Sequence, residues 1–291
     1  MIRVSRRTLI VGAAAGLCGG AAPAAARLAA IEARVGGRLG VAALDVATGA
    51  RLARRADERF PMCSTFKAMA VASVLSRVDA GRERLDRFIP YGKADLLPHS
   101  PVTERHLAEG GMTLGDICAA GVEFSDNGAA NLILAAIGGP SQWTRFARSL
   151  GDTASRLDRN ELSLNTAIPG DPRDTTKPAA MAADLRAVML GDALSPASRR
   201  RLIDWMVACQ TGLARLRAGL PADWRVADKT GTGDHGSVND IAVAWTPAGP
   251  IIVTCYLTET TADTATCEAA IAEIGRVVAD AFRPLAETGH G

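Results

Sequence analysis

The chain has 291 residues, of which 48% are hydrophobic and 22% are charged, and its formal net charge is +2. This length and composition suit one large domain or two interleaved domains with a substantial core. The near-neutral charge, the 4% of aromatic residues and the lack of a basic run among aromatics exclude the usual signature of a nucleic-acid-binding protein.

The first 26 residues have the pattern of a signal peptide. Three arginines precede an apolar run, Leu9 to Leu17, and the small residues at 21–26 offer cleavage sites. The Arg6-Arg7 pair fits either a twin-arginine signal or a plain secretory signal, and the apolar run is too short for a membrane span. We therefore expect a periplasmic or secreted protein that has no membrane association after cleavage.

Five of the six cysteines lie beyond that segment, and an odd number in an oxidising compartment leaves at least one thiol without a partner. They are Cys63, Cys118, Cys209, Cys255 and Cys267. None belongs to a Cys-x-x-Cys or Cys/His array, so we predict no metal site and no cofactor. Small buried apolar residues are their default interpretation.

The first part of the exported chain predicts a helix, then a hairpin, then a second helix. Residues 27–35 carry apolar side chains at helical spacing. Two runs typical of strands follow at 39–47 and 50–54, separated by a Thr-Gly turn. The segment 66–78 is apolar and contains neither Pro nor Gly, which predicts a helix buried on most sides.

The middle of the chain is mainly helical and rich in loops. The helices predicted there are Thr113 to Phe124, Asn127 to Ile137, Ser141 to Leu150, Ala179 to Leu190 and Pro196 to Gln210. Residues 152–176 form a long polar segment with Pro and Gly, and a loop of that length in a compact domain is usually functional or disordered.

The pattern returns to strands after Pro221. Three are predicted at 224–232, 237–246 and 251–257, and a last helix carries apolar residues on one face, namely Ile271, Ile274, Val278 and Phe282.

Strands near both ends with helices between them predict an α/β (α+β) fold of two lobes. One antiparallel sheet of about five strands would be flanked by the N- and C-terminal helices. We expect residues 27–60 and 211–291 to form this lobe. Residues 61–210 would form an inserted all-helical lobe that includes the 152–176 loop.

Ser64 and Lys67 lie at the start of the 66–78 helix, where residues three apart share a face. A serine is a poor nucleophile without a base, and a lysine whose pKa is lowered by burial can take its proton. The helix N-terminus adds partial positive charge where an oxyanion would form. Taken alone, however, the pair is better explained as a capping serine and a lysine with a buried stem.

Two further motifs supply polar side chains in loops. In Ser125-Asp126-Asn127 the serine can carry a proton to a leaving group and Asn127 can hold a carbonyl, although the same residues form ordinary turns and caps. Glu161 and Asn165 lie four apart in the long loop. If their side chains converge, they could bind one water molecule and deprotonate it. The alternative is that Glu161 is a solvated acid of the loop.

The fourth motif, Lys229-Thr230-Gly231-Thr232, lies late in a predicted strand. Gly231 would allow a substrate to lie close to the backbone. Lys229 and Thr230 would donate to an anionic group, and the Thr232 N–H could complete an oxyanion hole. The alternative is an edge strand with a solubilising lysine.

These four motifs, in this order, resemble those of the class A serine β-lactamases, within the superfamily and fold that these enzymes share with penicillin-binding transpeptidases. The resemblance covers nearly the whole exported chain, including the runs 100–104, 167–171 and 173–176. Each motif alone is common, but the four with their linking segments are specific.

The resemblance implies a hydrolase of the EC 3.5.2.6 type. It would open the β-lactam amide of penicillins and cephalosporins through an acyl-enzyme on Ser64 and so confer resistance. The N–H groups of Ser64 and Thr232 would hold the oxyanion, and either Lys67 or Glu161 would activate Ser64. Ser125 would pass a proton to the lactam nitrogen. The expected partner is a small β-lactam, and the expected protein is a monomer.

The same resemblance implies that Glu161 and Asn165 activate the water that releases product, and that an Arg159–Asp174 ion pair closes the long loop. The residues implied in substrate binding are Asn127, Asn165, Lys229, Thr230, Gly231 and Thr232.

Some positions depart from the family pattern. Val238 stands where some members carry a carboxylate-binding arginine, and Arg215 matches the upstream alternative, so we assign Arg215 to substrate binding rather than to a helix surface. His99 stands where an aromatic wall is usual and is assigned to that wall. Leu162 replaces the proline that often follows Glu161.

Two cysteines match positions that form disulfides in some members. The partner position of Cys118 is Val71, and that of Cys63 is Gly233, so we predict neither bridge and do not predict carbapenem hydrolysis.

Two other functions share part of this pattern. A penicillin-binding D-Ala-D-Ala peptidase acting on peptidoglycan peptides would have Ser-x-x-Lys and Lys-Thr-Gly but generally lacks the deacylating loop with Glu161. A non-enzymatic sensor that binds β-lactams covalently would be expected to carry a membrane span or partner domain beyond the signal.

Overall fold

A computed structural model of the chain describes residues 21–283. Most of the predicted signal peptide lies outside the described residues. Its last part forms the first turns of helix α1 (Ala21–Val35), which begins before the predicted start at Arg27. Within the described range, none of the helices is both long and apolar enough to cross a membrane.

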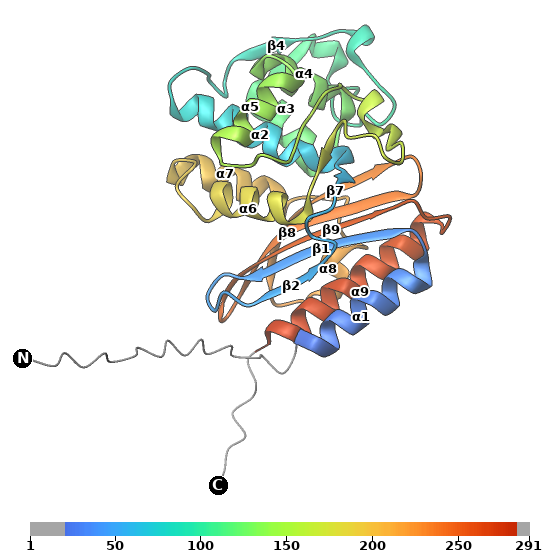
Figure 1. The fold of residues 1–291 in the computed structure, drawn as a ribbon. Helices are drawn as coiled ribbons and strands as arrows, with labels where there is room; N and C mark the ends of the chain where they lie inside the picture. The colour runs from blue at the N-terminus through green and yellow to red at the C-terminus, as the bar shows by residue number, and fades with distance from the viewer. Residues whose placement is uncertain (1–20, 284–291) are drawn as a thin grey trace, which may run out of the picture.

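A five-stranded antiparallel sheet, as predicted, forms the centre of the molecule (Figure 1). Its order is β2-β1-β9-β8-β7, so the N-terminal hairpin pairs with the last strand of the chain. The strands are β1 (Arg38–Asp45), β2 (Arg51–Arg54), β7 (Arg225–Gly233), β8 (Ser237–Thr246) and β9 (Gly249–Thr258).

Both faces of the sheet are buried. Successive residues of a strand point to opposite faces, so each strand contributes side chains to two cores. In β9, Val253 and Leu257 pack against helices α1 and α9 (Thr264–Phe282), whereas Ile252 and Tyr256 face the larger helical core. The short helix α8 (Leu216–Gly219), which the sequence analysis did not predict, also contributes to the α1/α9 side.

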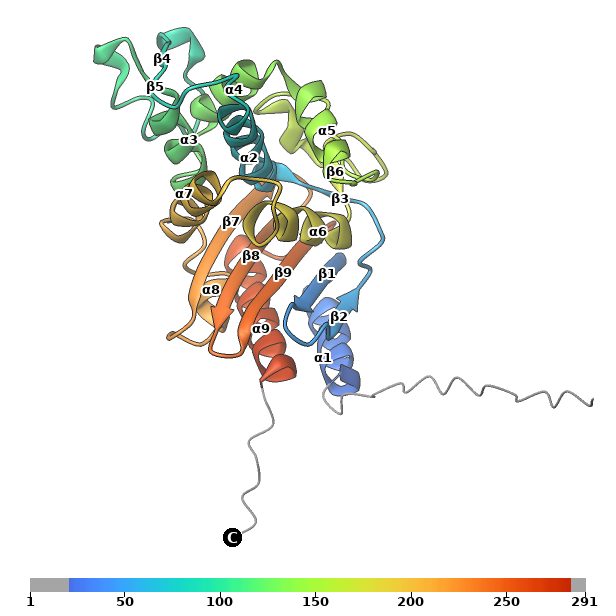
Figure 2. The ribbon, with the colours of Figure 1, turned by 90° about the vertical axis from the view of Figure 1, so that its left-hand side faces the viewer.

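The remaining α-helices lie on the other side of the sheet (Figures 1 and 2). They are α2 (Phe66–Asp79), α3 (Leu114–Glu123), α4 (Asn127–Ile137), α5 (Pro140–Ser149), α6 (Pro178–Met189) and α7 (Pro196–Val207). Helix α2 is their centre, with every residue from Phe66 to Leu75 buried. Helix α7 ends before the predicted Gln210, whose N–H donates instead to the Glu123 carbonyl.

Two short strand pairs and four 3₁₀ turns complete the described chain. The pairs are β3 (Phe60–Pro61) with β6 (Thr175–Thr176), and β4 (Phe88–Pro90) with β5 (Gly111–Thr113). The turns are η1 (Cys63–Thr65), η2 (Lys93–Asp95), η3 (Leu107–Glu109) and η4 (Ser163–Thr166). The β3–β6 pair joins the end of the long loop to the segment just before Ser64.

Candidate active site

Ser64 lies in the 3₁₀ turn η1, immediately before α2, and not in the first turn of α2 as predicted. Its side chain is buried but reaches the surface of a cleft. The hydroxyl Oγ contacts Glu161 Oε1 at 3.3 Å, so Ser64 has a carboxylate as its hydrogen-bond acceptor.

Lys67 is fully buried in the first turn of α2. Its amine Nζ donates to Asn127 Oδ1 (2.7 Å) and the Ser125 carbonyl (2.8 Å), and lies 3.1 Å from Glu161 Oε1. Burial lowers the pKa of Lys67, although the Glu161 charge opposes this shift. The described residues show no direct hydrogen bond from Lys67 to Ser64; the oxygen Oε1 of Glu161 contacts both.

Glu161 is buried and is held by contacts on its side chain and on its backbone. Its Oε2 accepts from Asn165 Nδ2 at 2.5 Å, which confirms that these two residues converge. Asn131 of α4 forms two hydrogen bonds with the Glu161 backbone. Its Oδ1 accepts from the Glu161 N–H (2.9 Å), and its Nδ2 donates to the Glu161 carbonyl (3.0 Å). The Glu161–Leu162 peptide is cis, although residue 162 is not a proline.

The long loop is closed by the predicted ion pair, in which Arg159 Nε lies 2.6 Å from Asp174 Oδ2. Arg159 also donates to Thr166 Oγ1 (3.0 Å), and the Asp174 carbonyl accepts from the Met62 N–H (2.9 Å). The loop that carries Glu161 is therefore fixed to the segment that carries Ser64.

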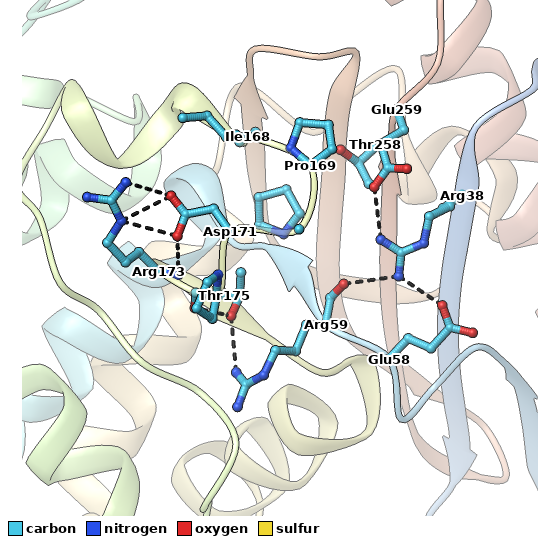
Figure 3. Close-up of a pocket in the computed structure, with 14 residues that line it drawn as sticks. Arg38, Glu58, Arg59, Ile168, Pro169, Asp171, Arg173, Thr175, Thr258 and Glu259 are labelled. Atoms are coloured by element: carbon cyan, nitrogen blue, oxygen red, sulfur yellow. Dashed lines mark hydrogen bonds and ion pairs between the residues drawn. The ribbon is translucent and has the colours of Figure 1, made fainter.

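Figure 3 shows a second pocket, of about 320 Å³, between this loop and the sheet. Its charged groups all have partners. Arg38 pairs with Glu58 and Glu259, Arg173 pairs with Asp171, and Arg59 donates to the Ala154 carbonyl and Thr175 Oγ1. It contains none of the four motifs, so we interpret it as part of the packing of the long loop against the sheet.

Ser125 lies between α3 and α4 with a positive φ of 57°, which directs its side chain between two lysines. Its Oγ is 3.0 Å from Lys229 Nζ and 3.4 Å from Lys67 Nζ. Asp126 has a structural role, because it caps α4 and accepts hydrogen bonds from Thr103 and the neighbouring backbone. Asn127 Nδ2 donates to the Pro98 carbonyl at 2.8 Å.

Lys229 lies on the edge strand β7 and is fully buried. Burial, reinforced by the positive charge of Lys67, lowers the pKa of Lys229 to about 8. Its burial excludes the alternative of a solubilising edge lysine.

Gly231 lines the cleft and also has a packing role. A Cβ at this position would lie 2.8 Å from the Met62 carbonyl and 3.1 Å from the Ser64 N–H nitrogen. The absence of a side chain therefore lets β7 approach the turn that carries the nucleophile, which brings Thr232 beside Ser64.

Arg215 is 4% exposed, so it is not a surface arginine. Its Nη2 donates to Thr232 Oγ1 (2.8 Å), and its Nη1 donates to the carbonyls of Gly231 (2.9 Å) and Asn239 (2.8 Å). Val238 pairs with Thr232 in the sheet. Arg215 thus places positive charge at the end of the Lys-Thr-Gly motif, and its assignment to substrate binding stays a prediction.

These residues surround a cleft of about 350 Å³. It is lined by Ser64, His99, Ser125, Asn127, Asn165, Thr211, Arg215, Thr230, Gly231 and Thr232. His99 forms an exposed wall and its Nε2 is hydrogen-bonded to the Phe124 carbonyl at 3.0 Å. Thr211 is the lining residue that the sequence analysis missed.

The five cysteines beyond the signal segment are all buried and unpaired in this structure. Burial raises the pKa of Cys63, Cys118 and Cys255, so these thiols are kept protonated. Residues 21–283 contain no cluster of His, Cys, Asp and Glu that could hold a metal ion.

The arrangement suits acyl transfer to a serine. It combines a hydroxyl with an adjacent carboxylate, a proton path through Ser125 between two amines, and donors for an anionic substrate group. Asn165 Oδ1 is buried and has no partner, which leaves an acceptor beside Glu161 for a water molecule.

Comparisons with known proteins agree with this chemistry. The model of the β-lactamase enzyme family matches residues 23–282. The chain is 45% identical over 289 residues to β-lactamase CTX-M-8 of Citrobacter amalonaticus, covering 96% of this chain and 99% of that protein. It is 49% identical to β-lactamase AST-1 of Nocardia asteroides, covering 88% and 83%.

Its structure is similar to that of an ancestral class A β-lactamase, with a TM-score of 0.87, 63% identity, and coverage of 89% of this chain and 100% of the other. The match of family model, curated relatives and fold over nearly the whole described chain shows that this protein belongs to the β-lactamase enzyme family, in its serine-dependent class A.

Proposed function

We infer that the protein hydrolyses the β-lactam amide bond of penicillin- and cephalosporin-type antibiotics and thereby confers resistance to them. The observation that carries this inference is the position of Glu161, whose two carboxylate oxygens contact Ser64 Oγ (3.3 Å) and Asn165 Nδ2 (2.5 Å). A protein that is only acylated needs no such carboxylate, whereas hydrolysis needs a base within reach of the acyl ester.

In the acylation step, Ser64 Oγ attacks the lactam carbonyl. The contact with Glu161 Oε1 favours this carboxylate as the acceptor of the Ser64 proton, with Lys67 holding it through the 3.1 Å ion pair. The N–H groups of Ser64 and Thr232 stabilise the oxyanion. Ser125, bonded to Lys229 Nζ, gives a proton to the lactam nitrogen as the ring opens. Lys67, 3.1 Å from Glu161 Oε1 and 3.4 Å from Ser125 Oγ, passes the proton taken from Ser64 on to Ser125, so Glu161 is ionised again before deacylation.

In the deacylation step, Glu161 deprotonates a water that also donates to Asn165 Oδ1, the buried oxygen without a partner. The water attacks the acyl ester and the released proton returns to Ser64. Asn127 and His99 bound the part of the cleft that holds the substrate side chain.

We propose that a single chain exported by residues 1–26 carries out this reaction in the periplasm or outside the cell. The four motifs meet within one chain, so the proposed reaction needs no residue from a second copy. The cleft would lie between an α/β lobe of residues 27–60 and 211–291 and a helical lobe of residues 61–210.

The test is turnover by the wild-type protein. A chromogenic cephalosporin should be hydrolysed in many cycles, and the intact mass after excess penicillin should return to that of the free protein. A penicilloyl adduct that persists on the wild-type protein would instead support the peptidase alternative.

Arg215→Ala is expected to lower kcat/KM by about 10- to 100-fold, since it removes a charged donor from the carboxylate site. Arg225→Ala is the control, because this exposed arginine of β7, the strand of the Lys-Thr-Gly motif, pairs with Asp204 and lies over the Trp245 ring, outside the cleft. Steady-state kinetics of both variants decide the point, and equal values for Arg215→Ala and wild type would mean that the charge lies elsewhere.

The Lys229 pKa of about 8 predicts an alkaline limit to activity. Below this pH the amine is protonated and attracts the substrate carboxylate, and above it the charge is lost, so kcat/KM falls as pH rises through about 8. In Lys229→Arg the guanidinium stays charged, and the fall should move to higher pH. If the pH profile of kcat/KM is the same for Lys229→Arg and the wild type, a group other than Lys229 sets the alkaline limit.

A further inference from the structure

Thr211 lies in the segment between α7 and α8 and lines the active-site cleft beside Thr230, Thr232 and Arg215. Its position is well defined. A side chain at the next residue, Gly212, would overlap the Asp228 carboxylate, so this backbone packs directly against β7.

The hydroxyl of Thr211 has two close neighbours. Its Oγ1 lies 2.5 Å from Thr230 Oγ1 and 3.3 Å from Cys209 Sγ. Among the described residues, Thr211 is the hydrogen-bond partner recorded for the Thr230 hydroxyl. The Thr230 carbonyl, by contrast, is already engaged by Lys229 Nζ at 2.9 Å.

The direction of these hydrogen bonds follows from the number of protons that each group can donate. Each hydroxyl has one proton, and sulfur is a weaker acceptor than oxygen. The Cys209 thiol stays protonated, because burial and the nearby Asp228 charge raise its pKa. Whether the thiol donates to Thr211 or to Asp228, the better acceptor for the Thr211 proton is the Thr230 oxygen at 2.5 Å.

A substrate carboxylate changes what Thr230 must do. Charged acceptors form the stronger hydrogen bonds, so the Thr230 proton turns to the carboxylate. The Thr230 oxygen then needs a donor of its own, and Thr211, 2.5 Å away, supplies it.

We propose that Thr211 is a positioning residue for carboxylate-bearing β-lactams, which acts through Thr230 by donating a hydrogen bond to its hydroxyl. The proposal rests on the proposed function, because it assumes that Thr230 binds the substrate carboxylate. It extends the anion site from β7 to the segment that follows α7.

Thr211→Val removes the hydroxyl and keeps the shape of the side chain. We expect kcat/KM for a cephalosporin to fall about 3- to 10-fold, through a higher KM with kcat nearly unchanged. Thr211→Ser should restore the wild-type value. Thr258→Val is a matched control, since it breaks the buried Ser237–Thr258 hydroxyl pair (2.8 Å) in the sheet that carries Thr230, and neither residue lines the cleft.

Two comparisons separate positioning from a general loss of structure. For the methyl ester of the same cephalosporin, which has no carboxylate, Thr211→Val and wild type should have the same kcat/KM. In a Thr230→Val background, Thr211→Val should cause no further loss, because the two residues then act as one unit.

An equal loss for acid and ester, an additive loss in the double variant, or a wild-type value for Thr211→Val would each overturn the proposal. None of these results bears on the hydrolase function itself, which stands or falls on turnover by the wild-type protein and its loss with Ser64.

Discussion

Ser64→Ala is expected to abolish hydrolysis of a chromogenic cephalosporin, lowering kcat by about 10⁴- to 10⁶-fold. The substitution removes the only atom that forms the acyl bond. Its effect on stability should be small, within about 1 kcal/mol of the wild-type unfolding free energy, because Ser64 Oγ has one long contact, to Glu161. Initial rates and a denaturant melt measure the two effects separately.

Ser73→Ala is the matched control for this experiment. Ser73 is a buried serine of α2, the helix that follows the turn of Ser64, and does not line the cleft. This variant should keep its turnover, so that a loss confined to Ser64→Ala reports on chemistry. Undiminished turnover by Ser64→Ala would refute the acyl-enzyme mechanism.

Glu161→Gln is expected to trap the acyl-enzyme. The amide can still accept from Lys67 and lie against Asn165, but it cannot take a proton from water, so deacylation should slow by about 10²- to 10⁴-fold. Intact-mass spectrometry after mixing with a penicillin should show a stable increase equal to the mass of the antibiotic. The speed at which the adduct grows reports whether Lys67 can replace Glu161 in acylation.

Asp171→Asn provides the comparison within the same loop. Asp171 pairs with Arg173 and lies outside the cleft, so its loss should leave deacylation unchanged. Complete turnover by Glu161→Gln, with no adduct at any time, would remove Glu161 from the deacylation step.

Elements with a long periodic pattern could be predicted closely from the sequence. Helix α4 and strand β8 have the predicted bounds, and the three predicted strands after Pro221 form the five-stranded central sheet together with the N-terminal hairpin. The pairs β3–β6 and β4–β5 were not predicted, because two or three residues are too few to show a period. The start of α1 was missed because alanines suit both a cleavage region and a helix.

The site residues could be predicted as a set, but their contacts could not. Sequence spacing suggested a direct Ser64–Lys67 pair, whereas in the structure Glu161 contacts both residues. Hydrogen bonds also join Asn131 to the Glu161 backbone and Thr211 to Thr230. The spacing of these residues in the sequence does not predict either contact. Such contacts depend on how distant segments pack, so only coordinates reveal them. The catalytic roles themselves stay predictions until the variants are measured.

The pairing of β1 with β9 sets a condition on when activity can arise. Arg38 is aligned with Thr258, so the middle of the sheet joins the two ends of the chain. A ribosome or translocon that still holds the last strand leaves β8 without a neighbour on one side, and β7 depends on β8 for its place beside Ser64. Contacts this distant in sequence form late and slowly. The nucleophile should therefore remain inert throughout synthesis, and acquire its reactivity only after the last strand has left the ribosome and paired with β1 and β8.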